Sequence, residues 1–401
     1  MALDAKQEDL IIGVVGAGAM GRGIAQVAAV GGCLVKLYDA KEGEAAEAQA
    51  FVQKMLDRNV EKGRMAQEDA EDAAARIEVI NSMSGFAGSR CIIEAVVENL
   101  DVKHVVFKEL ETIVADDCVI ATNTSSLSVS AIASACEKPE RVAGLHFFNP
   151  VPLMKLVEVI DGVLTDPVVG DFLMVLGRRF GRESIRVKDA PGFLVNQVGR
   201  GYNIESTHIV MDGIADFADI DRILRDAVGF RMGPFQLLDL TAIDVTHPAT
   251  EMIYKQFYHE PRYRPATMLQ MRLDAGLLGS KVGRGFYEYL EGNMQVGVEP
   301  PAPAYDGRAV WVSDAIPEFG EKIRLILEGI GAPIDKGELP ARESLILVTP
   351  LGDDATTASI DQGLDATRTV AVDCLFGLET RRTLMKTAIT DPAFATAAHG
   401  L

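Results

Sequence analysis

The chain has 401 residues, of which 48% are apolar, and its formal net charge is −19 at pH 7. This length exceeds what one hydrophobic core usually organises, so two or three domains are expected, and the negative charge argues against nucleic-acid binding through phosphate neutralisation. No apolar run reaches the roughly 18 residues that cross a bilayer, and the N-terminus lacks the regions of a signal peptide, so we expect a cytoplasmic protein without a membrane partner.

Short β-rich runs alternate with longer alanine-rich segments of helical period in the first part of the chain. The runs are LIIGVV, LVKLYD, CIIEAVV, CVIAT and VAGLHFF, which begin at residues 10, 34, 91, 118 and 142. This alternation indicates a parallel sheet covered by helices. We assign this α/β domain to residues 1–187.

A glycine-rich turn, GAGAMG, follows the first run. Gly16 permits a tight turn, Gly18 lets a pyrophosphate approach the backbone, and Gly21 allows close helix packing, with the phosphates at the positive end of the helix. The motif is weak alone, but Asp39 ends the second run 18 residues beyond Gly21. A carboxylate there accepts hydrogen bonds from a ribose and repels a 2′-phosphate, which favours NAD over NADP. The residues expected along the pyrophosphate are Gly16, Ala17, Gly18, Ala19, Met20 and Gly21.

The apolar stretch LHFFNPVPLMKLVEVI, residues 145–160, holds one histidine and one glutamate. Its prolines and asparagine suggest a turn between two short strands. If the turn is centred near Pro152, strand pairing brings His146 opposite Glu158. A carboxylate beside an imidazole fixes its tautomer and stabilises its charged form, as a general base requires. On these residues alone, a structural histidine with a surface glutamate is an equal alternative.

A nicotinamide enzyme that oxidises an alcohol must remove the hydroxyl proton as the hydride leaves. It therefore needs a base near the carboxyl ends of the strands. The segment CVIATNTSSL ends a strand there and supplies the hydroxyls of Ser125 and Ser126. His146 and Glu158 follow directly in the chain, so these motifs converge on one predicted site.

The rest of the chain divides into three segments. Residues 188–290 show apolar residues at helical spacing and predict a helical domain for substrate binding and dimerisation. Residues 291–304 are rich in glycine and proline and predict a linker. In residues 305–401, AVWVSD, LILVTP and TVAVD predict a smaller Rossmann-like α/β unit without a glycine fingerprint. The five cysteines form no C-x-x-C motif or zinc-type cluster, so no metal is expected.

Six motifs together closely resemble those of the L-3-hydroxyacyl-CoA dehydrogenases, over residues 11–289. They are GAGAMG, EAVVENL, NTSSL, GLHFFNPVPLMKLVEV, PGFLVN and KVGRGFY. The resemblance implies NAD-dependent oxidation of (S)-3-hydroxyacyl-CoA, with an acyl-CoA as small-molecule partner and a homodimer as assembly. It is strongest for bacterial forms that act on short or dicarboxylic acyl-CoAs. Longer bacterial relatives continue, after a unit like residues 305–401, with a second helical domain.

The resemblance also implies roles for single residues. His146 becomes the general base, Glu158 its orienting partner, and Ser125 and Asn196 the groups that hydrogen-bond the reacting oxygen or thioester. Lys62 is expected to contact coenzyme A. Around NAD, in addition to Asp39 and the glycine turn, the expected residues are Glu98, Lys103, Ser125, Asn149 and Lys281.

Several of these residues have a simpler interpretation. Ser125 could cap a helix that begins near Ser128, and Asn196 could be an ordinary residue at a helix start. Glu98 and Lys103 could lie on the surface beside a helix start. Lys62 lies at helical spacing from two other cations, and acids are interleaved with them. This pattern favours a solvated helix face with ion pairs over a phosphate site. The residues are Lys54, Asp57, Arg58, Glu61 and Lys62.

Two other functions compete with the leading one. The first is a β-hydroxyacid dehydrogenase that acts on a substrate without CoA. Enzymes of that group rely on a catalytic lysine and lack the HFFNP motif that this chain contains. A catalytically silent NAD-binding scaffold is opposed by the intact pair of His146 and Glu158. Gly199 and Gly201 stand where relatives have stronger helix formers, which predicts a loosened helix beside the acyl pocket.

Overall fold

The computed structural model describes residues 3–401 and divides into two compact units. The first unit comprises Met1–Gly201 and Ala249–Arg264, and the second comprises Tyr202–Pro248 and Pro265–Leu401. Among the described residues, no helix is long and apolar enough to cross a membrane. The same residues contain no group of three or more histidine, cysteine, aspartate or glutamate side chains that could hold a metal ion.

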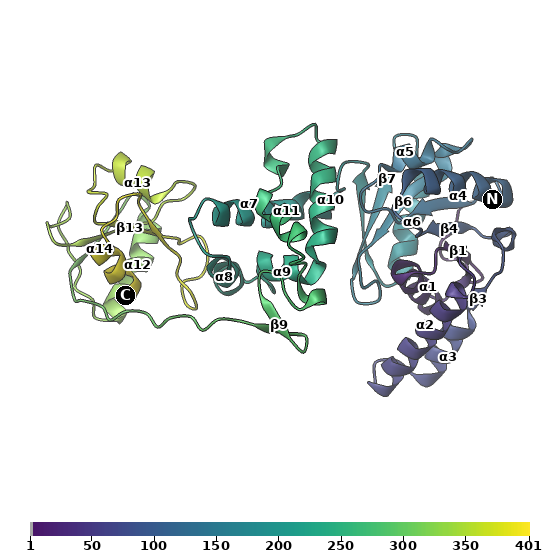
Figure 1. Cartoon of the computed structure of the whole chain (residues 1–401), viewed down its shortest axis with the longest axis horizontal. Coiled ribbons are helices and arrows are strands. Elements are labelled where there is room, and N and C mark those ends of the chain that lie inside the picture. The colour runs from purple at the N-terminus through teal and green to yellow at the C-terminus, as the bar shows by residue number, and fades with distance from the viewer. Residues whose placement is uncertain (1–2) are drawn as a thin grey trace. The chain divides into compact units, whose positions relative to one another are not determined.

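An eight-stranded sheet forms the centre of the first unit, in the order β3-β2-β1-β4-β5-β6-β7-β8 (Figure 1). Strands β1 to β6 are parallel to their neighbours, β7 is antiparallel to β6, and β8 is parallel to β7. The order of the six parallel strands is that of a Rossmann-type fold, which confirms the predicted α/β class. The strands are β1 (Ile11–Val15), β2 (Leu34–Tyr38), β3 (Ile77–Val79), β4 (Cys91–Glu94), β5 (Val119–Thr122), β6 (Val142–Phe147), β7 (Leu156–Asp161) and β8 (Glu183–Lys188).

Both faces of this sheet are buried. Val14 of β1 packs in one apolar cluster, and its neighbour Val15 packs in a second cluster with Ile92 and Ile120. Adjacent residues of a strand point to opposite faces, so helices must cover both. These helices are α1 (Ala19–Val30), α2 (Glu44–Glu61), α3 (Gln67–Ala75), α4 (Leu100–Ile113), α5 (Val129–Ala133) and α6 (Pro167–Arg179). Helices α2 and α3 pack together and project from the sheet as an arm (Figure 1).

Side chains fix the starts of the helices nearest the carboxyl edge of the sheet. Asn99 caps α4 by accepting a hydrogen bond from the amide of Val102, and Ser128 caps α5 in the same way through Ala131. Helix α7 (Val195–Met211) runs without a break through Gly199 and Gly201. The two glycines therefore do not interrupt this helix, although they lower its intrinsic stability.

The helical part of the second unit has a core of aromatic and aliphatic side chains, including Phe235, Leu238 and Phe286. Its helices after α7 are α8 (Phe217–Arg222), a π-helical turn (Ile223–Ala227), α9 (Pro234–Thr241) and α11 (Thr267–Asp274), and α10 (Ile243–Gln256) continues into the first unit. Two fully buried acids tie the KVGRGFYEY segment to these helices. Asp221 accepts the hydroxyl of Tyr287, and Asp239 accepts the amides of Phe286 and Tyr287.

The segment predicted as a linker, residues 291–304, includes part of a hairpin. Strand β10 (Asn293–Gln295) pairs antiparallel with β9 (Glu288–Leu290). Residues 296–309 have no regular secondary structure. A two-residue turn, Glu291 and Gly292, joins the strands, and both residues have positive φ, as hairpin turns of this length require.

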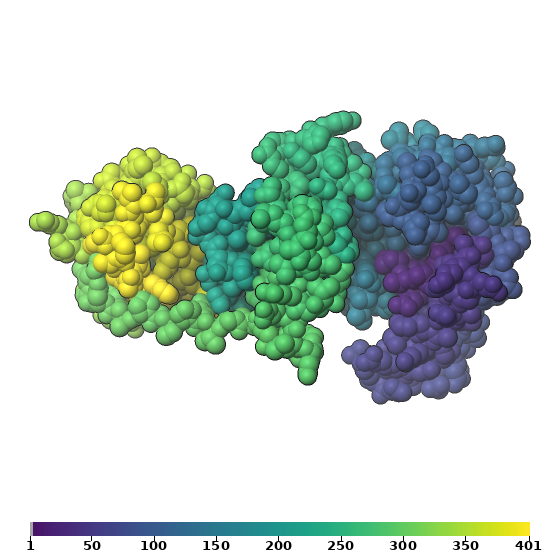
Figure 2. Space-filling model, in the orientation of Figure 1, coloured from purple at the N-terminus to yellow at the C-terminus, as the bar shows by residue number. Residues whose placement is uncertain are grey.

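The C-terminal residues form a rounded body (green to yellow in Figure 2) around a four-stranded sheet of order β11-β12-β13-β14. The first three strands are parallel, as predicted, and the short antiparallel β14 was not predicted. The elements are β11 (Val310–Val312), α12 (Pro317–Gly329), β12 (Leu345–Val348), α13 (Ala355–Asp361), β13 (Thr369–Val372), β14 (Leu384–Lys386) and α14 (Pro392–Gly400).

Candidate active site

The turn between β1 and α1 has the shape that a bound pyrophosphate needs. Gly16 has φ +94°, and a Cβ atom there would lie 2.6 Å from the carbonyl oxygen of Ala95. A Cβ atom at Gly21 would lie 1.7 Å from the carbonyl oxygen of Gly16, whereas one at Gly18 would have nothing within 4 Å. Gly16 and Gly21 are thus required by the fold, and Gly18 leaves open backbone at the helix N-terminus, where an anion is stabilised.

Asp39 lies directly after β2 and touches the glycine turn. Its Oδ2 accepts a hydrogen bond from the amide of Ala17 at 2.7 Å, and its Oδ1 accepts one from the amide of Lys41 at 2.9 Å. The carboxylate is thus fixed beside the turn and remains partly exposed. Lys41, the cation that could favour a 2′-phosphate, forms an ion pair with Glu44.

His146 and Glu158 face each other across β6 and β7, in the register predicted from a turn centred near Pro152. The imidazole Nδ1 lies 2.7 Å from Glu158 Oε2, and both side chains are buried. Glu158 Oε1 accepts hydrogen bonds from the amides of Leu194 and Val195 at the start of α7, at 3.0 and 2.9 Å. Both oxygens of this carboxylate are therefore engaged, one by the histidine and the other by the start of α7.

Aromatic rings surround this pair. The ring centroids of Phe148 and Phe193 lie 4.5 and 5.7 Å from that of His146. Phe193 has φ +50°, an uncommon conformation for an aromatic residue, which its buried position maintains. The apolar rings keep water from the imidazole, so the His146–Glu158 contact is shielded from solvent.

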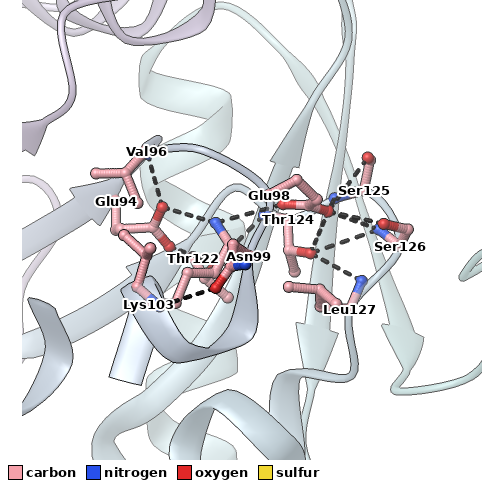
Figure 3. A network of polar contacts seen from close by, with 11 residues as sticks. Glu94, Val96, Glu98, Asn99, Lys103, Thr122, Thr124, Ser125, Ser126 and Leu127 are labelled. Carbon is pink, nitrogen blue, oxygen red and sulfur yellow. Dashed lines mark hydrogen bonds and ion pairs between the residues drawn. The ribbon is translucent and has the colours of Figure 1, made fainter. Parts of the chain in front are cut away.

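Glu98 organises the turn that contains Ser125 and Ser126 (Figure 3). Its Oε1 accepts the amides of Ser125 and Ser126 at 2.9 and 3.1 Å, the Thr124 hydroxyl at 2.7 Å and the Ser126 hydroxyl at 2.9 Å. Burial raises the pKa of Glu98, but the Lys103 charge and these hydrogen bonds outweigh burial and leave the pKa lowered. Glu98 is therefore an ionised residue that is exposed at the surface and is held by the turn and by Lys103.

Lys103 is buried beneath Glu98, with 1% of its side chain exposed. Its Nζ lies 2.7 Å from Glu94 Oε1 and 3.4 Å from Glu98 Oε2. Lys103 was predicted to contact NAD. Since Glu94 and Glu98 surround its ammonium group, we expect Lys103 to affect NAD binding through Glu98. Glu94 was missed from the sequence, since a glutamate that ends an apolar strand has no marker of its own.

Ser125 does not cap the following helix, because Ser128 performs that role. The side-chain amide of Asn196, in the first turn of α7, lies 3.5 Å from the carbonyl oxygen of Ser125. Asn123, also missed from the sequence, accepts the amide of Phe147 through its side-chain oxygen at 2.8 Å and so joins the ends of β5 and β6. Its position directly after a strand at the carboxyl edge is a signal that could have found it.

A cleft of about 540 Å³ lies between α1, α2 and the β6–β7 turn. Asn149 contributes to its wall, as does Phe51, over which the Arg22 guanidinium stacks at 3.8 Å from the ring centroid. Four cations line it: Arg22, Arg58, Lys62 and Arg64. In the described residues neither Arg58 nor Lys62 forms an ion pair with the interleaved Asp57 or Glu61, and Asp57 accepts a hydrogen bond from Gln53 instead. These cations lie on a solvated face, as the sequence favours, but without the expected ion pairs, so the cleft presents unneutralised positive charge.

Lys281 belongs to the second unit, in a short turn of helix (Ser280–Val282). Its Nζ pairs with Asp244 at 2.5 Å, and its side chain is partly exposed. Its expected contact with NAD therefore stays a prediction.

Two family descriptions match the chain: "3-hydroxyacyl-CoA dehydrogenase, NAD binding domain" over residues 11–190 and "3-hydroxyacyl-CoA dehydrogenase, C-terminal domain" over residues 192–289. The 3-hydroxyadipyl-CoA dehydrogenase of Escherichia coli is 36% identical over 320 residues, which are 79% of this chain and 67% of that protein. A probable 3-hydroxybutyryl-CoA dehydrogenase of Bacillus subtilis is 36% identical over 278 residues, 69% of this chain and 96% of that protein.

Solved structures agree with these matches. The 3-hydroxybutyryl-CoA dehydrogenase from Escherichia coli is similar over 98% of this chain and 78% of its own, with a TM-score of 0.82 and 30% identity. The (S)-3-hydroxybutyryl-CoA dehydrogenase from Ralstonia eutropha is similar over 70% of this chain and 99% of its own, with a TM-score of 0.68 and 36% identity. Since the matches run from the glycine turn to residue 289 and include both domains of one family, the chain belongs to the 3-hydroxyacyl-CoA dehydrogenases, which are NAD-dependent oxidoreductases.

Proposed function

We propose that His146 is the general base of this NAD-dependent 3-hydroxyacyl-CoA dehydrogenase and that Glu158 orients it. The observation that carries this proposal is the buried 2.7 Å contact between His146 Nδ1 and Glu158 Oε2. A carboxylate on Nδ1 keeps the ring proton on that nitrogen, so Nε2 retains the lone pair that accepts a proton. Glu158 then stabilises the imidazolium that forms.

Oxidation of the substrate alcohol breaks two bonds to hydrogen. The hydroxyl proton passes to His146 Nε2, the oxygen electrons form the carbonyl, and the hydrogen on the same carbon leaves with its bonding pair. Bound NAD supplies the acceptor for that hydride. Phe148 and Phe193 keep the imidazole dry, which protects the transferred charge from solvent.

We assign the positioning of the reacting oxygen or thioester to Ser125 and Asn196. The turn that carries Ser125 is held by Glu98, and Asn196 lies beside the same turn. For the cofactor, the open backbone at Gly18 and the fixed carboxylate of Asp39 fit a pyrophosphate and an adenosine ribose. Glu98, Asn149 and Lys281 are further proposed NAD contacts, and Lys103 supports Glu98 from below.

We assign the phosphates of coenzyme A to the cationic cleft. Lys62 was expected there by resemblance, and Arg58 and Arg64 stand in the same wall. Guanidinium and ammonium groups bind phosphate through charge-assisted hydrogen bonds. Membership of the family and this cleft together favour a CoA thioester over a free hydroxy acid as substrate.

The test is an NADH absorbance assay over (S)- and (R)-3-hydroxyacyl-CoAs of increasing length, including the dicarboxylic 3-hydroxyadipyl-CoA. We expect reduction of NAD with the (S) series and no reduction with the (R) series or with 3-hydroxyisobutyrate. Turnover of the free acid alone would support a β-hydroxyacid dehydrogenase. NAD binding without any turnover would support a silent scaffold.

The larger organisation of the chain is proposed on the same basis. We propose an NAD-binding domain over residues 1–187, a helical substrate and dimerisation domain over residues 188–290, a linker over residues 291–304 and a Rossmann-like unit over residues 305–401. We further propose a homodimer that works in the cytoplasm.

A further inference from the structure

We infer that Glu94 is a positioning residue that acts through Lys103 and Glu98 on the Ser125–Ser126 turn. The inference rests on the proposed function, because it concerns the same active-site turn. Among the described residues the Glu94 side chain bonds to Val96, Lys103 and Thr122 and not to that turn or to His146, so any effect on turnover must pass through its neighbours.

Glu94 is the last residue of β4 and is fully buried. Its Oε1 accepts hydrogen bonds from the Lys103 ammonium group and from the amide of Val96, both at 2.7 Å. Its Oε2 accepts the Thr122 hydroxyl at 2.8 Å. Three donors from three segments thus hold this carboxylate in one orientation, as Figure 3 shows. The Glu94 carboxylate is therefore fixed in position relative to Lys103 and Glu98.

Lys103 stands between two carboxylates at unequal distances. The contact with Glu94 is 2.7 Å and the contact with Glu98 is 3.4 Å, and the ammonium group has almost no solvent around it. A buried cation requires compensation by nearby negative charge. In this arrangement Glu94 makes the shorter contact and fixes the ammonium group, so Lys103 attracts Glu98 without drawing it away from the turn.

Glu98 is consequently free to bind the turn. Its Oε2 faces Lys103, while its Oε1 holds the amides of Ser125 and Ser126. Without the charge of Glu94, Lys103 would draw the Glu98 carboxylate toward itself, because no other acid lies within ion-pair distance among the residues that the structure describes. The hydrogen bonds to the turn would lengthen, and Ser125 would leave its position.

A second buried pair on α4 offers a matched control. Glu111 lies 3.2 Å from Arg141, with exposed side-chain fractions of 11% and 6%. It also accepts the amides of Glu137 and Lys138, much as Glu94 accepts that of Val96. Glu111→Gln therefore removes an ion-paired carboxylate of the same kind, on the helix that carries Lys103, and Glu111 makes no hydrogen bond to the Ser125–Ser126 turn among the described residues.

The first experiment compares Glu94→Gln with Glu111→Gln in the whole enzyme. We expect Glu94→Gln to lower kcat about 10- to 100-fold, because small displacements of a positioning group cost that much, while KM for the acyl-CoA changes less than about threefold. Glu111→Gln should lower the melting temperature with an unchanged kcat. Glu94→Asp keeps the charge but withdraws the carboxylate from Lys103, and it should give the same pattern more weakly. It replaces Glu94→Gln if that variant does not fold.

The second experiment is a double-mutant cycle with Glu98→Gln. If Glu94 acts through Glu98, Glu94→Gln should lower kcat little further in the Glu98→Gln background. Replacing Lys103 by Met together with Glu94→Gln removes the uncompensated cation and should restore part of the lost kcat. If the double variant instead lost kcat by the product of the two single losses, Glu94 and Glu98 would act independently. That result would overturn the inference.

A readout without turnover separates this inference from the proposed function. Amide hydrogen exchange at Ser125 and Ser126 should accelerate about tenfold in Glu94→Gln and remain unchanged in Glu111→Gln, because the acceptor on Glu98 is displaced. Unaltered exchange in Glu94→Gln refutes the positioning role even in an inactive protein. Absence of 3-hydroxyacyl-CoA oxidation by the unmodified enzyme refutes the proposed function and leaves the exchange result to decide the inference.

Discussion

His146 and Glu158 have different roles in the proposed reaction. His146 would carry the transferred proton, whereas Glu158 would only orient and stabilise it. We predict that His146→Gln lowers kcat roughly 100- to 10,000-fold, the usual contribution of general-base catalysis, with little change in NAD affinity. Glu158→Gln should lower kcat by a smaller factor than His146→Gln does. Steady-state kinetics together with NAD titration would measure both effects, and near-normal turnover of His146→Gln would show that the assignment is wrong.

Asp39 is fixed by two backbone amides and is therefore unable to turn away from a 2′-phosphate. We predict a strong preference for NAD over NADP, and we predict that Asp39→Ala narrows it mainly by weakening NAD binding. The comparison is kcat/KM for the two coenzymes in the unmodified enzyme and the variant. The preference should fall by about tenfold or more, since a charge-assisted hydrogen bond is lost. Equal kcat/KM for both coenzymes in the unmodified enzyme would refute this role.

At the scale of elements, helix α2 carries the cations assigned to coenzyme A. Replacing both Arg58 and Lys62 by Ala should raise KM for the acyl-CoA about 5- to 20-fold and leave kcat nearly unchanged, because these side chains are exposed and are assigned to the phosphates and not to the reacting group. Lys54→Ala is the control, since Lys54 lies on the same helix but does not line the cleft. An equal effect of Lys54→Ala would point to general attraction by the helix rather than a phosphate site.

The turn between β5 and α5 depends on the ionised form of Glu98. Since its folded-state pKa is lowered, Glu98 contributes stability that is present above its unfolded pKa of about 4.3 and is lost as pH falls through the folded-state value. Glu98→Gln should therefore lower the free energy of unfolding near neutral pH, and the difference from the unmodified protein should shrink below about pH 4. Urea unfolding at several pH values measures this difference. A gap that grew on acidification would contradict the sign of the shift.

Some elements of the site could be predicted from local patterns, and others could not. The register that places His146 opposite Glu158 follows from a turn between two apolar runs, because pairing in a hairpin is fixed by its centre. The link between Glu94 and Lys103 depends on how α4 packs on β4, which no local pattern encodes. Strands β3 and β14 have three residues each, too few for a periodic signal.

At the scale of the whole molecule, the C-terminal sheet repeats the parallel arrangement of the first without its phosphate site. Pro317 begins α12 and has no amide hydrogen to donate, and Glu318 places a carboxylate in the first turn, while Asp314 beside it is paired with Arg324. This helix start therefore offers a phosphate fewer amide donors and a nearby negative charge. The glycine turn after β1 provides the opposite environment, so similar topology does not imply a similar ligand.

We therefore predict that each chain binds one NAD and that residues 305–401 have a packing or linking role. Calorimetric titration should give one site per chain, unchanged by Asp314→Ala and weakened by Asp39→Ala.

A chain shortened after Val296 retains the β9–β10 hairpin and should keep its activity within about threefold, because an interface outside the site affects geometry only slightly. The ion pairs of Arg381 with Asp226 and Glu299 would be lost, so the shortened chain should be less stable to heat. Two NAD sites per chain, or a folded shortened chain without activity, would give the C-terminal unit a direct part in catalysis.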